Sequence, residues 1–130
     1  MKGVFVKSIL VILGVLLFST VAPADTEPVS AEAEAMLDEA ASLRAKAEEV
    51  LAEGKAKAAR YRDKAYEARK EGAVSAGKHP SRTVIIMSKA EDKVERYNNR
   101  ADKALAEAEA QAQGYLTEAA ELEEAAGTKR

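Results

Sequence analysis

The amino-acid sequence predicts an all-α protein, a long antiparallel helical hairpin built as an alanine-rich two-stranded coiled coil. Beyond the first 24 residues, alanine, glutamate, lysine and arginine dominate the chain, and these residue types favour long helices over sheets or disorder. Small and apolar residues recur there at steps of three and four. Helix-breaking residues cluster once in this alanine-rich part, between Gly72 and Pro80. Two helical arms joined by one turn fit all three observations.

Residues 1–24 have the features of a secretory signal peptide and are set apart from the fold. A short basic start, MKGVFVK, is followed by the apolar stretch SILVILGVLLF and the small-residue ending STVAPA. The apolar run is shorter than the roughly 18 residues that a spanning helix needs. We therefore expect export and cleavage between Ala24 and Asp25, with an uncleaved signal anchor as the alternative. The sequence has no cysteine, which argues against a lipid anchor and leaves stability to packing.

The remaining residues divide into three further segments. Residues 25–29 form a polar leader, residues 30–126 the helical hairpin with its turn near residues 73–81, and residues 127–130 a tail.

The bounds of the two arms come from capping signals. Ser30 is a good N-cap for the first arm, which we expect to end at about Gly72. Pro80 is tolerated in a first helical turn, so the second arm is expected to begin there and to end at about Ala126, before Gly127. At 1.5 Å per residue, each arm should be about 65 Å long.

A seam of small and apolar residues runs along each arm with the spacing of a coiled coil. In the first arm the seam consists of Ala33, Met36, Ala40, Leu43, Ala47, Val50, Gly54, Ala58, Tyr61, Ala65, Ala68 and Gly72. In the second arm it consists of Met87, Ala90, Val94, Tyr97, Ala101, Ala104, Ala108, Ala112, Tyr115, Ala119, Leu122 and Ala126. Each seam contains one extra step of four, which relaxes the supercoil locally.

Antiparallel pairing about a centre near His79 brings these two irregularities side by side and pairs the seam residues throughout. The pairs include Leu43 with Tyr115, Gly54 with Ala104, and Tyr61 with Tyr97.

Alanine layers bury little apolar surface, since a buried methylene contributes only about 0.8 kcal/mol. Residues beside the seam are therefore expected to form a second stripe that needs another surface, namely Leu37, Leu51, Tyr66, Leu105 and Leu116. Self-association into a four-helix bundle would cover this stripe; scattered exposed side chains are the alternative.

Charge is segregated along the predicted hairpin. Residues 30–54 carry seven acids and two bases, and residues 104–126 carry six acids and no base, so the open end should be acidic. Residues near the turn are rich in bases. We expect a basic tip formed by nine residues, called the basic set: Lys55, Lys57, Arg60, Arg62, Lys64, Arg69, Lys70, Lys78 and Arg82. An antiparallel pair of hairpins would match acidic to basic halves; screening of solvated charges by salt is the alternative.

Residues with catalytic, cofactor-binding or metal-ligating potential are few, and we predict none of these sites. His79 is the only histidine, and one imidazole without cysteine does not make a transition-metal site. The strongest apolar run is residues 84–87, VIIM. We expect it to pack with Ala73 and Val74 and close the hairpin tip, with an exposed binding tip as the alternative.

These features predict an exported, non-enzymatic structural or adaptor coiled-coil protein of the bacterial cell envelope or extracellular space. A periplasmic holdase chaperone is the alternative, followed by a small cation-binding helical bundle. The expected partner is a second copy, as an antiparallel dimer, or another envelope protein. Nucleic acid is not expected, and membrane contact is expected only through the signal sequence before cleavage.

Overall fold

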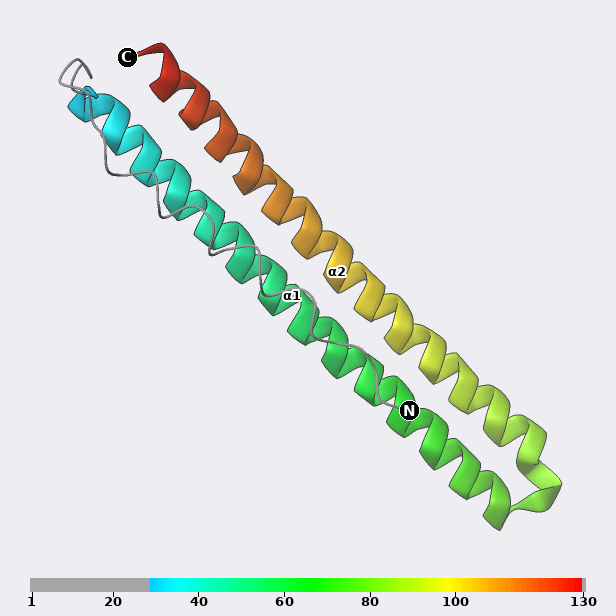
Figure 1. Cartoon of the computed structure of the whole chain (residues 1–130). Helices are drawn as coiled ribbons and strands as arrows, with labels where there is room; N and C mark the ends of the chain where they lie inside the picture. Colours follow the sequence, from blue (N-terminus) through cyan, green and yellow to red (C-terminus); the bar gives the residue numbers. More distant parts are fainter. Residues whose placement is uncertain (1–28, 130) are drawn as a thin grey trace, which may run out of the picture.

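The structure, a computed structural model, describes residues 29–129 as two long antiparallel helices joined by one tight connection (Figure 1). Helix α1 spans Ala31–Lys78, the short 3-10 helix η1 spans Pro80–Arg82, and helix α2 spans Thr83–Thr128. No strand occurs among the described residues. The predicted all-α helical hairpin is confirmed. The predicted signal peptide, its cleavage site and most of the polar leader lie outside the described residues.

The start of α1 is capped as its sequence predicts. The Ser30 hydroxyl accepts a hydrogen bond from the Ala33 backbone N–H at 3.2 Å, which satisfies one of the free donors of the first turn. Glu32 and Glu34 lie in that turn, where the helix dipole favours negative charge.

The first helix is longer than predicted, because Gly72 does not end it. Helix α1 continues to Lys78, and Gly72 and Ala76 are both buried against α2. Gly72 is a seam residue at a close helix contact rather than a helix breaker. The helix ends at Lys78, and its C-cap is His79, the residue before Pro80, where the proline ring disfavours helical backbone. The connection is therefore limited to residues 79–82. At the other end, α2 includes Gly127 and stops at Thr128, two residues after the predicted end.

Backbone groups of the connection form hydrogen bonds within it and with the neighbouring helix ends. The His79 N–H donates to the carbonyl oxygens of Ser75 and Ala76, both at 3.2 Å. The Arg82 N–H donates to the His79 carbonyl at 2.9 Å, and the Thr83 hydroxyl donates to the Pro80 carbonyl at 3.0 Å. The turn is thus a compact, hydrogen-bonded corner.

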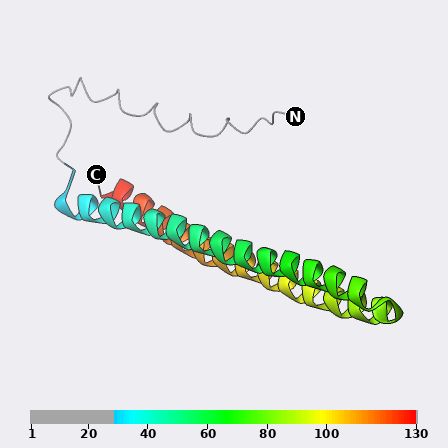
Figure 2. The same ribbon diagram turned by 90° about the horizontal axis from the view of Figure 1, so that it is seen from below.

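The interface between the two helices follows the predicted seam. Every seam residue of both arms is buried or half-buried. The two views show the helices running side by side from the open end to the turn (Figure 1, Figure 2). Leu43, which is 6% exposed, packs with Ala40 and Ala119, and Tyr115 and Leu122 pack against this cluster. This cluster agrees with the predicted pairing of Leu43 with Tyr115.

Two glycines lie where the helices approach each other closely. A Cβ atom added to Gly54 would lie 2.2 Å from the Ala108 Cβ, and one added to Gly72 would lie 2.4 Å from the Ala90 Cβ. The side chain nearest to Gly54 is thus Ala108, one helical turn from the predicted partner Ala104, whose carbonyl oxygen would lie 3.5 Å from the added atom. Small residues at these positions allow the helix backbones to come close together.

Candidate functional site

Exposed surfaces, rather than an enclosed cavity, are the candidates for function in this rod. Within residues 29–129, no group of three or more potential metal-ligating side chains comes together. No helix in this part of the chain is long and apolar enough to cross a membrane. Three surfaces remain: the flanks beside the seam, the acidic open end, and the end of the rod at the turn.

The predicted second stripe is partly covered by the hairpin itself. Leu37, Leu51, Leu105 and Leu116 are half-buried. Long side chains beside an alanine seam have room to lie across it, because alanine fills little of the space between the helices. Tyr66 differs, since it is 70% exposed. The stripe is therefore less exposed than the sequence alone suggests.

The basic set is exposed throughout but is not one compact patch. Its nine residues lie on solvent-facing positions of α1 and η1. Arg62 lies 3.8 Å from Asp102 of α2, and the Lys64 ammonium lies 6.0 Å from the centre of the Tyr61 ring. Only Lys78 and Arg82 flank the turn. The antiparallel register also brings Lys89 of α2 to this end, a residue that the predicted set leaves out.

The end of the rod at the turn, residues 72–90, is called the hairpin tip. Val74 is 53% exposed, Val84 is 82% exposed and Ile85 is 60% exposed. The expectation that VIIM packs with Ala73 and Val74 is therefore wrong for Val84 and Ile85. Successive helical residues point about 100° apart, so one partner helix cannot cover four in a row. Only the later two, Ile86 and Met87, are half-buried.

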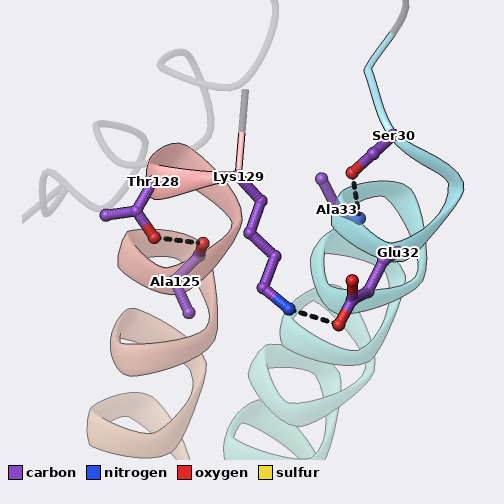
Figure 3. A network of polar contacts seen from close by, with 6 residues as sticks. All are labelled: Ser30, Glu32, Ala33, Ala125, Thr128 and Lys129. Atoms are coloured by element: carbon purple, nitrogen blue, oxygen red, sulfur yellow. Dashed lines mark hydrogen bonds and ion pairs between the residues drawn. The ribbon is translucent and has the colours of Figure 1, made fainter.

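The open end of the rod is held by ion pairs between the helices. Arg44 of α1 donates two hydrogen bonds to the Glu123 carboxylate of α2, from Nε at 2.9 Å and from Nη2 at 2.8 Å. Nearer the ends of the helices, the Lys129 ammonium donates to the Glu32 carboxylate (Figure 3). The same view shows the Thr128 hydroxyl donating to the Ala125 carbonyl at 2.8 Å. These contacts offset part of the repulsion expected between the two acidic segments.

Comparison with known proteins adds no constraint to these surfaces. No protein-family model, curated protein or solved structure matches the chain. Functional assignment therefore rests on the geometry and charge of the hairpin.

The Arg44–Glu123 pair yields a prediction about ionisation. The hydrogen bonds from Arg44 lower the pKa of Glu123 below its ordinary value. A lowered pKa in the folded state stabilises the protein at pH values above the ordinary glutamate pKa, and this contribution is lost as the pH falls through the lowered value. We expect Arg44→Gln to raise the Glu123 pKa toward the ordinary value, measured by NMR titration of its carboxyl carbon.

The matched control for this titration is Lys46→Gln, which removes the same charge two residues away and leaves the pair intact. It should leave the Glu123 pKa nearly unchanged. An equal rise of the Glu123 pKa in both variants would mean that net charge, rather than the hydrogen bonds, sets it.

Proposed function

We propose that this chain is an exported, non-enzymatic structural or adaptor coiled-coil protein of the bacterial cell envelope or extracellular space. In this role it is a rigid spacer whose two ends present different charge to different partners. The observation that carries the proposal is the unbroken packing of α1 against α2 from the open end to the turn.

Stiffness is supported by the small size of the interface residues. Alanines and the two close-contact glycines bring the helix backbones together, and the connection adds only four residues between the helices. The 46 residues of α2 correspond to a rod about 70 Å long at 1.5 Å per residue. A rod of this kind holds its two ends at a set distance.

Different partners at the two ends are supported by the charge distribution. Acids dominate both helices at the open end, and bases dominate toward the turn. Matching of opposite charge guides association and its orientation. A second copy lying antiparallel, or another envelope protein, is accordingly the partner that we propose, and we do not propose nucleic acid.

A holdase chaperone ranks second, because it requires an oligomer with an apolar inner face. Large apolar side chains that are exposed in the described residues are few and scattered over both ends and one flank: Val29, Tyr66, Val74, Val84 and Ile85. A cation-binding bundle ranks third, because the sequence has one histidine and no cysteine to serve as ligands.

Site-specific photo-crosslinking in cells that produce the full chain tests the proposal. A photoreactive residue is placed at Ser81 beside the turn, at Glu121 near the open end, or at Ala59 in the middle of the rod, all three exposed. We expect adducts at Ser81 and Glu121 that differ in mass, and few at Ala59. An adduct of twice the chain mass would identify a second copy.

Two results would contradict the spacer. Recovery of the chain only from the cytoplasm would remove export from the proposal. Adducts with many different proteins, spread evenly over the three positions, would favour the holdase instead.

A further inference from the structure

Exposed aliphatic side chains and a net positive charge meet at the hairpin tip. We propose that the hairpin tip binds the surface of an anionic phospholipid bilayer. The aliphatic side chains enter the headgroup layer, and the neighbouring cations contact the lipid phosphates. This differs from the sequence expectation that only the signal sequence contacts a membrane.

The apolar part of the site comes from both helices. Val74 lies in the last turns of α1, and Val84 and Ile85 lie in the first turn of α2, on either side of the four-residue connection. All three are more than half exposed. Their positions place three aliphatic side chains at one end of a narrow rod. Both views show the start of α1 and the end of α2 at the other end (Figure 1, Figure 2).

The charged part of the site is unusually uniform. From Gly72 to Ala90 the sequence contains no aspartate or glutamate, while Lys78, Arg82 and Lys89 are all exposed. Glu71, just outside the tip, lies near Lys78 and Lys89, and residues 54–62 also carry four bases and no acid. None of the exposed large apolar residues lies in that second stretch, so within residues 29–129 the tip alone combines both features. Near an anionic surface each lysine or arginine contributes about 1 kcal/mol to binding. A stretch without acids is therefore suited to a surface of lipid phosphates.

The shape of the tip suits a lipid surface. The three aliphatic residues lie at one end of a narrow two-helix rod. A fluid headgroup layer requires no matching concave surface. The hydrogen bonds of His79, Arg82 and Thr83 within the turn also lower the cost of bringing this backbone to a membrane.

The opposite end of the rod sets the orientation. Glu118, Glu121 and Glu124 lie near the end of α2, together with the acids that begin α1. An anionic bilayer repels this end and attracts the tip, so the rod should approach the surface with the turn first.

Fluorescence from a single label tests the site in the full chain. Because the sequence has no cysteine, Ser81→Cys allows an environment-sensitive fluorophore to be attached beside the turn without replacing Val84 or Ile85. Ser42→Cys carries the same label at an exposed position of the acidic half. Vesicles contain phosphatidylglycerol and phosphatidylcholine in equal parts, or phosphatidylcholine alone.

We expect a blue shift, and quenching by spin-labelled lipid, for the label at position 81 on the phosphatidylglycerol vesicles only. The label at position 42 should remain in water on both kinds of vesicle. This readout is local to the tip, so binding of the apolar residues 1–24 to vesicles does not imitate it.

Paired variants separate the two parts of the site. The double variant Lys78→Gln with Arg82→Gln should bind the vesicles about thirtyfold more weakly, because each lost charge removes about 1 kcal/mol of binding free energy. Val84→Ser with Ile85→Ser should weaken it roughly tenfold or more, because the lost aliphatic groups no longer enter the headgroup layer. Lys55→Gln with Lys57→Gln, and Tyr66→Ser, are the matched controls away from the tip. Circular dichroism verifies that each variant keeps its helices.

Three outcomes would overturn the proposal. One is a label at position 81 that stays in water on phosphatidylglycerol vesicles. Another is an equal response on phosphatidylcholine alone. The third is a blue shift that grows with protein concentration in the absence of vesicles, which would assign the hairpin tip to contact between copies of this chain.

Discussion

Gly54→Leu should lower the free energy of unfolding by about 3 kcal/mol, because it inserts a large side chain at a close contact between the two helices. Even the first added atom, Cβ, would lie 2.2 Å from the Ala108 Cβ, so the helix backbones must separate. Gly54→Ala should cost less, since alanine favours the helix by about 1 kcal/mol and offsets part of the clash. Urea denaturation followed by circular dichroism measures both losses.

Two controls isolate the clash from the effect of glycine on the helix. Gly77→Ala and Gly114→Ala place a Cβ atom where nothing lies within 4 Å. They should raise the free energy of unfolding by about 0.5 to 1 kcal/mol. Combining Gly54→Ala with Ala108→Gly moves the methyl group from one helix to the other and should restore nearly the original stability. Equal effects of alanine at positions 54 and 114 would refute the close contact.

Leu43→Ala is expected to lower the free energy of unfolding by about 2 to 3 kcal/mol. Among the large aliphatic residues of the described chain, Leu43 alone is buried, with 6% of its surface exposed. Its removal leaves a gap between Ala119 and the side chains of Tyr115 and Leu122, which alanine neighbours cannot fill. Thermal unfolding followed by circular dichroism measures the loss.

The control for this substitution is Leu51→Ala, which makes the same chemical change at a half-buried position beside the seam. We expect it to cost about 1 kcal/mol, because less apolar surface returns to water. If both leucines cost the same, the cluster around Leu43 would not be a centre of stability.

The architecture of the hairpin can be predicted from the sequence because small and apolar residues recur with the same spacing in every helical turn. Each seam residue, from Ala33 to Ala126, contributes to the same spacing, and the two irregular steps restrict the pairing of the arms. Ser30 could be assigned as the N-cap for a similar reason, since a hydroxyl residue immediately precedes the helical pattern.

The role of Gly72 and the exposure of the hairpin tip could not be predicted from the sequence. A glycine in a sequence is compatible both with the end of a helix and with close helix packing, and only the position of Ala90 on the other helix decides between them. The exposure of Val84 and Ile85 depends on where the connection ends, and a shift of a few residues rotates them relative to α1. The Arg44–Glu123 pair depends on the conformations of two long side chains. Such conformations leave no periodic pattern in the sequence from which the pair could be predicted.

The short connection also determines how the molecule assembles. Contacts beside the turn close small loops, whereas the contact of Lys129 with Glu32 joins residues 97 positions apart. Since the entropic cost of closing a loop rises with its length, α1 and α2 should pair first beside the turn and then progressively toward the open end. The acidic termini are then the last part to join and the first to fray.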